Sequence, residues 1–224
     1  MSADFDIVRH PRARRAKLSV DPASGRVRLT LPRRAPLKAA LRWAEEQHVW
    51  IAAQRARLPQ ARPFIPGAVI PCGDAELTIV WQPEAPRRIE RKDDELHCGG
   101  PIEGLSRRIA MWFRREALRV LAEETALSAA RAGVTVGTVA VGDPKARWGS
   151  CTSSGVIRYS WRLILAPGHV LRSTVAHEVA HRVHMNHSAE FHALAAALDP
   201  GDPAVSRAWL RRHGAGLHWF GRES

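Results

Sequence analysis

Apolar residues between positions 171 and 184 recur with the period of an α-helix and occupy one broad face of it. They are Leu171, Val175, Ala176, Val179, Ala180 and Val183. Three histidines, His177, His181 and His184, form a narrow stripe on the opposite side. This pattern predicts a helix that is buried except along its histidine stripe. Pro167 and Gly168 precede it, and the pattern leaves its first residue open.

Elsewhere the pattern predicts an α+β chain. Alternating residues at 17–20 and 26–31, separated by turn residues, predict a hairpin, and a helix is expected at 36–58. Further strands are expected at 76–81, 87–90, 134–141 and 155–165, and further helices at 104–132, 188–198 and 203–213. We expect a basic, β-rich N-terminal part with one long helix at 1–100, and an α+β catalytic domain at 101–224.

Composition adds a strongly basic surface to this picture. The 224 residues are 45% hydrophobic and 25% charged, as in ordinary globular proteins, but the net charge is +12. Such a charge attracts nucleic acid, although scattered arginines are also typical of a solvated surface. The first twenty residues are polar and rich in arginine, so we expect neither a secretory signal nor a membrane anchor among them. Three cysteines without close pairing fit a reducing compartment. We therefore expect a cytoplasmic protein without a membrane span.

The histidine stripe carries the candidate chemistry, because residues 177–181 read HEVAH. Residues four apart lie one above the other on a helix, so His177 and His181 can direct their rings at one ion, with Glu178 beside it. A zinc ion held with an open position lowers the pKa of bound water, and a neighbouring glutamate serves as general base. Burying these polar side chains without a metal or hydrogen-bond partners would be costly. The sequence therefore predicts a metal site.

Three residues compete for the place of third ligand. His184 lies on the same stripe, but seven positions beyond His177 means about 10 Å along the helix axis, too far to converge on one ion. His187 is better placed if the helix ends near His184 and the chain turns back, and Asn186 tolerates the left-handed backbone of such a turn. Glu190 on the next helix is the other alternative. We rank His187 first, Glu190 second and His184 third.

Four blocks in this order resemble the YgjP-like metallopeptidases, which are related to SprT-like and Wss-type zinc proteases. They are RWGSC at 147–151, WRLILAP at 161–167, HEVAH at 177–181, and NHS at 186–188 with Phe191. The resemblance is strongest from Arg147 to Phe191, and the flanking segments are compatible with it. It implies one Zn²⁺ per chain held by His177, His181 and His187, and Glu178 as catalytic base. It also implies a zincin core of the minigluzincin-like kind, with a small sheet packed against the HExxH helix.

The segment before this helix is a candidate for substrate binding. Zinc peptidases commonly hold an extended substrate along an edge strand, and residues 155–165 alternate well enough to form one. Trp148 could wall a side-chain pocket, Gly149 could allow close backbone approach, and Ser150 completes the block. Trp148, Trp161 and Cys151 could instead pack in the core. A donor for the developing oxyanion is also needed, and the candidates are Tyr159, Arg147, Arg158 and Arg162.

The sequence therefore predicts a zinc-dependent metallopeptidase that acts on peptides or proteins. Its relation to SprT-like proteases, which act on protein crosslinked to DNA, implies one alternative, a nucleic-acid-associated protein with DNA-stimulated proteolysis. A non-proteolytic metal hydrolase is the other. The remaining histidines, including His213 and His218, have no spacing that joins the main site, so we expect them to pack or lie on the surface. The substrate and the oligomeric state stay open.

Overall fold

A computed structural model describes residues 5–223, and it has an α+β architecture of six α-helices and three small mixed sheets within that range. Contacts between Cα atoms divide the chain into two compact units, Met1–Gln60 and Ala61–Ser224. This division falls earlier than the sequence-based boundary at residue 100. The reason is that apolar residues between 61 and 100 pack into the same core as the helices that follow them.

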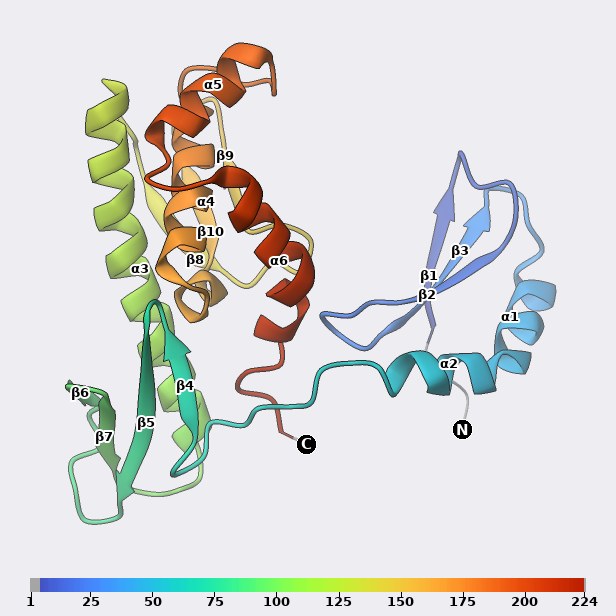
Figure 1. Ribbon diagram of the computed structural model, residues 1–224. Helices are drawn as coiled ribbons and strands as arrows, with labels where there is room; N and C mark the ends of the chain where they lie inside the picture. Colours follow the sequence, from blue (N-terminus) through green and yellow to red (C-terminus); the bar gives the residue numbers. More distant parts are fainter. Residues whose placement is uncertain (1–4, 224) are drawn as a thin grey trace. The chain divides into compact units, whose positions relative to one another are not determined.

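The first unit is a three-stranded sheet with two helices (Figure 1). Strand β3 (Val27–Pro32) lies between β1 (Phe5–His10), which is parallel to it, and β2 (Lys17–Val20), which is antiparallel. The predicted hairpin is confirmed, whereas β1 was not expected. The expected helix at 36–58 is instead two helices, α1 (Leu37–Glu46) and α2 (His48–Arg55), which meet at Gln47. Their apolar residues share a small core with the sheet, formed by Leu18, Val27, Leu29, Leu31, Ala40, Ala44 and Ile51.

A four-stranded sheet opens the second unit. Its strands, in spatial order, are β4 (Val69–Cys72), β5 (Ala75–Gln82), β7 (Glu95–Gly99) and β6 (Glu90–Lys92). Ile70, Leu77 and Leu96 belong to the same apolar core as Ile109 and Phe113 of the following helix. This sheet therefore belongs to the larger unit, because its buried face has no core of its own.

Two helices form the centre of the larger unit. The predicted long helix is confirmed as α3 (Leu105–Ala132), which ends at Gly133 in the left-handed conformation, with φ 65°. Helix α4 (Gly168–Ala180) packs against it, and Figure 1 shows the two side by side. The first amide of α4, that of Gly168, donates to the carboxylate of Asp74 over 2.7 Å. A residue distant in sequence therefore caps this helix, which explains why the local sequence contains no capping signal.

A second small sheet lies beside α4. Strand β10 (Ile157–Ser160) is central, with β8 (Val139–Gly142) parallel on one side and β9 (Gly149–Cys151) antiparallel on the other. The expected strand at 155–165 is wrong in its second half, where residues Trp161–Leu165 form a buried 3-10 helix, η1. The strand that remains, β10, is also not an edge strand of its sheet, because β8 and β9 pair with it on either side. The edge strand that contacts α4 is β9, which carries Gly149 and Ser150.

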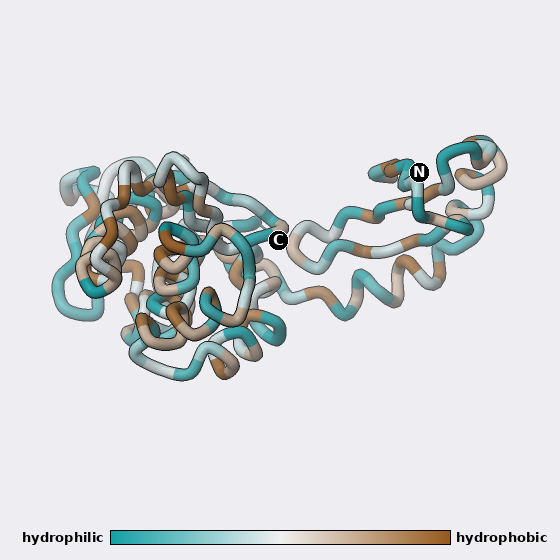
Figure 2. Tube along the Cα trace, turned by 90° about the horizontal axis from the view of Figure 1, so that it is seen from above, coloured by the Kyte–Doolittle hydropathy of each residue, from teal (hydrophilic) through white to brown (hydrophobic). Residues whose placement is uncertain are grey.

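The C-terminal part adds α5 (Ala189–Leu198) and α6 (Pro203–Leu217). The predicted entry at Ser188 is confirmed, because its hydroxyl accepts from the amide of Phe191. Figure 2 shows hydrophobic and hydrophilic residues alternating along the elements of both units, as amphipathic elements require. None of the helices in the described range has the length and apolar character needed to cross a bilayer. Cys72, Cys98 and Cys151 are free thiols.

Candidate metal centre

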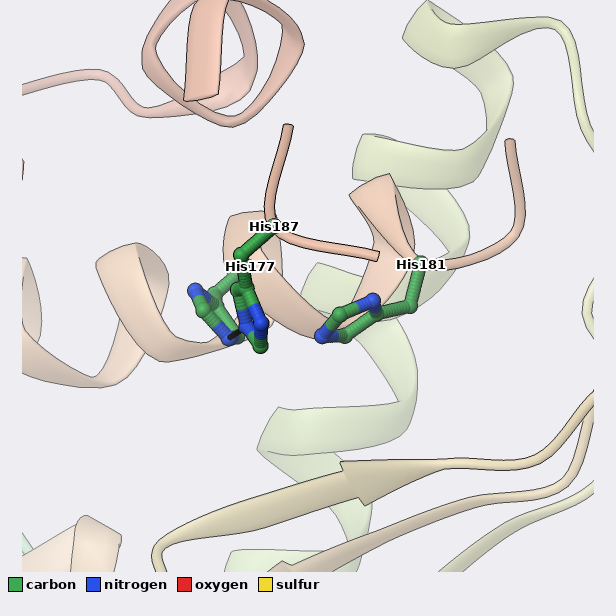
Figure 3. A group of neighbouring side chains, drawn as sticks. All are labelled: His177, His181 and His187. Carbon is green, nitrogen blue, oxygen red and sulfur yellow. Dashed lines mark hydrogen bonds between the residues drawn. The ribbon is translucent and has the colours of Figure 1, made fainter. Parts of the chain in front are cut away.

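Three imidazoles converge beside the end of α4. The ligand atoms of His177, His181 and His187 all lie within 4.8 Å of one another, and Nε2 of His177 is 3.3 Å from Nε2 of His187. Figure 3 shows the rings of the three residues pointing toward one another, two from the helix and one from the segment that follows it. No other group of three histidines, cysteines or carboxylates in the described range meets this geometry. His213 and His218 are therefore outside it.

The early end of α4 brings His187 to the other two histidines. The helix ends at Ala180, and His181 already occupies the C-cap position. The predicted continuation to His184 is therefore wrong, and Val183, which was expected on the buried face, is 47% exposed. Asn186 also lacks the left-handed backbone that we expected, since Asp93 is the one non-glycine residue with positive φ among those described. A tight turn at 181–187 returns the chain without it.

The two alternatives to His187 occupy other positions. The backbone carbonyl of His184 lies 3.1 Å from Nδ1 of His181. A hydrogen bond at Nδ1 leaves Nε2 free to face the cluster, which is how proteins commonly orient a metal-binding imidazole. Glu190 is exposed in the first turn of α5, where a hydrogen bond with Ser188 lowers the pKa of its carboxyl. Neither side chain joins the group of three.

The ring of Phe191 packs against all three histidines of the cluster. Its ring is fully buried, and its centroid lies 4.9 Å from that of His177, 4.5 Å from that of His181 and 4.7 Å from that of His187. One rigid side chain on α5 thus touches all three imidazoles and limits their rotation. In the sequence Phe191 was only part of a motif, and its role depends on how α5 packs against α4.

Glu178 lies beside the cluster and is only 5% exposed. Burial raises the pKa of its carboxyl to about 7, and the nearby positive charge of Arg147 opposes this increase. Gly149 of β9 lies so close that a Cβ atom there would be 2.6 Å from Cγ of Glu178. The absence of a side chain at position 149 therefore provides the space for the Glu178 side chain.

The ring of His177 is in the neutral form that metal binding requires. Burial, and after it the neighbouring His181 and His187, lower the pKa of His177 to about 4. Its ring is therefore neutral at pH 7, with a lone pair available. Neutral imidazole nitrogens suit zinc, copper, iron and nickel, so the donor set fits a divalent transition metal.

A pocket of about 280 Å³ opens next to His177 and Glu178. Trp148 and Gly149 line one part of it, and Leu210 of α6 lines another. The Trp148 ring stacks on His218 at 5.4 Å between centroids. Of the three residues expected to bind substrate, Trp148 and Gly149 thus reach the pocket, whereas Ser150 is not among its lining residues. Trp161 is 2% exposed, so the packing interpretation holds for it.

Only one of the four candidate oxyanion donors lines the pocket beside Glu178. Tyr159 is fully buried, and its hydroxyl is 3.0 Å from that of Thr125 on α3. Arg162 is also buried and donates to Asp143. Arg158 is exposed and is not among the residues that line the pocket. Arg147 lines the same pocket as His177 and Glu178, so it alone of the four combines a donor with access to the site.

An ion pair between the buried Arg162 and the half-buried Asp143 supports the segment that carries Arg147 and Trp148. Arg162 donates from Nε to Asp143 over 2.7 Å, and its Nη1 donates to the carbonyls of Leu217 and Phe220. Burial would raise the pKa of Asp143, but the contacts with His218 and Arg162 outweigh it and hold that pKa well below its usual range. Nδ1 of His218 lies 3.7 Å from the same carboxylate. The pair thus ties residues 143–148 to the end of α6.

Comparison with protein families identifies the chain. A family model described as the YgjP-like metallopeptidase domain matches residues 14–213. No curated protein and no solved structure matches the chain. The matched range includes all three histidines, Glu178 and the pocket beside them, and the family name implies a bound metal. The chain therefore belongs to the YgjP-like metallopeptidase family.

Proposed function

We propose that the chain is a zinc-dependent metallopeptidase in which His177, His181 and His187 hold one Zn²⁺ and Glu178 is the general base. The observation that carries this proposal is the 3.3 Å separation between Nε2 of His177 and Nε2 of His187, with His181 in the same cluster. Zn–N distances of about 2.0–2.1 Å at tetrahedral angles place two ligand nitrogens roughly 3.3–3.4 Å apart. The arrangement of α4, β9 and β10 is then a zincin core of the minigluzincin-like kind.

The chemistry follows from the positions of the protein groups. A zinc ion held by the three histidines with one coordination position open would activate water and polarise the scissile carbonyl. Glu178 would accept a proton from the water as the water oxygen bonds to the scissile carbonyl carbon. It would then deliver that proton to the amide nitrogen, whose bond to the same carbon breaks so that the nitrogen leaves as an amine. Its buried environment raises its pKa to about 7, which suits a group that must both take and give a proton at neutral pH.

The same geometry supports a place for the substrate. We propose that an extended peptide pairs with the edge strand β9, whose Gly149 brings the backbone next to Glu178. The pocket lined by Trp148 and Leu210 would then take one side chain of the peptide. This proposal moves the substrate strand from residues 155–165 to β9, since β10 is enclosed by neighbours on both sides.

The substitution Glu178→Gln tests the mechanism. Glutamine has nearly the same shape but cannot act as a base, so the purified variant should keep one zinc per chain, measured by mass spectrometry of the metal, and lose hydrolysis of a peptide library. Retained hydrolysis would reject Glu178 as the base. A wild-type protein that binds zinc but cleaves no peptide would instead favour a non-proteolytic metal hydrolase.

A further inference from the structure

The first unit carries a groove of about 780 Å³ that the metal chemistry does not use. One wall is formed by the connection between β1 and β2, with Arg12, Arg14 and Arg15, and by Lys17 at the start of β2. We call these residues together the basic loop. The other wall includes Trp43 of α1 and Trp50 of α2. In Figure 1 the connection is the long blue loop that follows β1, and α1 and α2 follow in light blue and cyan. The groove lies entirely within the unit Met1–Gln60.

The positive charges along this groove are not neutralised by neighbours. Arg12, Arg14, Arg15 and Lys17 are exposed, and within residues 5–223 none of them forms an ion pair. Arg9, by contrast, donates to the carbonyls of Pro32 and Arg33 and supports the fold. The first 60 residues contain thirteen Lys or Arg and five Asp or Glu, which accounts for eight of the net charge of +12. The charge is therefore concentrated where the groove is.

The two tryptophans are exposed without a packing role in the core. Trp43 is 37% exposed and Trp50 is 39% exposed, and neither belongs to the apolar cluster of this unit. Large aromatic rings at a surface commonly mark a binding site. Here they lie in the same groove as a row of cations, which combines flat apolar faces with positive charge.

We propose that this groove binds single-stranded nucleic acid, with phosphates on the basic loop and bases stacked on Trp43 and Trp50. Unpaired bases offer the planar faces that tryptophan stacks on, while arginines and lysines follow the backbone. An acidic peptide satisfies the cations but brings few planar groups. Duplex DNA satisfies the cations too, but its bases are already stacked on one another. Of these three ligands, only a single-stranded nucleic acid offers both phosphates for the basic loop and unstacked bases for the tryptophans.

Fluorescence anisotropy of the full chain with a labelled oligonucleotide tests the proposal. We expect binding of a single strand of about 15 nucleotides, as oligo(dT) or oligo(U), that is tighter than binding of a duplex of equal length. Affinity must fall steeply with salt, because each phosphate contact adds about 0.7 to the slope for single strands. Comparing oligo(dT) with oligo(U) shows whether the groove prefers DNA or RNA.

Matched variants distinguish binding in the groove from attraction by the overall positive charge of the protein. Arg14→Ala/Arg15→Ala should weaken binding and lower the salt slope by about 1.4. Arg55→Ala/Arg57→Ala removes the same charge from exposed positions that do not line the groove, and should change the affinity much less. Trp43→Ala and Trp50→Ala should each weaken binding roughly 5- to 150-fold, whereas Trp43→Phe/Trp50→Phe keeps a stacking ring and most of the affinity. Thermal melting checks that each variant folds.

A fluorescence measurement keeps the test valid if an alanine variant fails to fold. Bases stacked on tryptophan quench its emission, so the single strand should quench the wild type more than Trp43→Phe/Trp50→Phe. Equal quenching would overturn the proposal. So would equal losses in the two arginine pairs, or binding of an acidic peptide that depends on the tryptophans as strongly as binding of the oligonucleotide does.

Discussion

Gly149 of β9 and Glu178 of α4 are in direct contact, and a Cβ atom at position 149 would come within 2.6 Å of Cγ of Glu178. The substitution Gly149→Ala should therefore displace the Glu178 carboxyl. We expect peptide hydrolysis to fall on the order of 100-fold, since small misplacements of a catalytic group have large effects on rate. Zinc content should not change, because no histidine of the cluster lies among the three atoms nearest to the added methyl group.

Gly216 provides the matched control for this substitution. It lies in α6, and a Cβ atom there would meet nothing within 4 Å. Gly216→Ala should keep full activity and gain up to about 1 kcal/mol of stability from the lower entropy of the unfolded chain. If Gly149→Ala hydrolysed peptides as fast as Gly216→Ala, the contact with Glu178 would have no catalytic importance.

His187 and His184 should respond differently to the same substitution. His187→Ala removes one of the three converging nitrogens, so it should abolish stable zinc binding. His184→Ala keeps the backbone carbonyl that faces Nδ1 of His181, so its zinc content should stay near one per chain. Equilibrium dialysis with metal analysis measures both. Zinc loss in His184→Ala with full zinc in His187→Ala would reverse the ligand assignment, and Glu190→Gln tests the remaining alternative.

Phe191 should control zinc affinity without being a ligand. Phe191→Leu keeps an apolar side chain but removes the flat ring that contacts three imidazoles, and we expect zinc affinity to fall about 10- to 100-fold, as for other groups that orient metal ligands. Competition with a chromophoric chelator measures this. Phe113→Leu is the control, because Phe113 is fully buried in the same core but stacks on Phe64. A similar loss of affinity in both variants would assign the effect to general destabilisation.

Arg147 should contribute to the rate of hydrolysis. As a donor at the pocket, it would stabilise the developing oxyanion, so Arg147→Ala should lower kcat on the order of 100-fold while KM and zinc content change little. Arg147→Lys should recover part of the rate. Arg158→Ala removes an equal charge from an exposed position of β10 and should be neutral. An effect confined to KM would show that Arg147 binds substrate in the ground state.

Asp143 should matter for stability. Asp143→Asn leaves the buried Arg162 guanidinium without its counter-charge, which costs on the order of 3 kcal/mol of unfolding free energy. Because folding lowers the pKa of Asp143, its contribution is present above the unfolded value of about 3.9 and is lost as pH falls below it. Urea denaturation should therefore show the difference between the variant and the wild type beginning to shrink below about pH 4 and shrinking further as the pH falls towards the much lower folded pKa of Asp143. Asp94→Asn, at an exposed carboxylate, should show neither effect.

Local patterns explain the parts of the fold that were predicted correctly. The hairpin of β2 and β3, the long helix α3 with its stop at Gly133, and the entry of α5 at Ser188 each depend on residues adjacent in sequence. The errors have a different cause. Helix α4 ends at Ala180, four residues before the predicted end near His184, and residues 161–165 form a buried 3-10 helix, since packing in the core outweighs local preference there.

The sequence by itself determined the relation of His177, Glu178 and His181, because helical periodicity places residues i, i+1 and i+4 at fixed positions around one axis. It also favoured His187 over His184 through the rise per residue. Only the tertiary structure decided what surrounds them. The contact of Gly149 with Glu178, the Phe191 ring beneath the histidines, the Asp74 cap on α4 and the groove between the basic loop and two tryptophans all join residues from separate elements. Such contacts follow from how the elements pack, which no short stretch of sequence specifies.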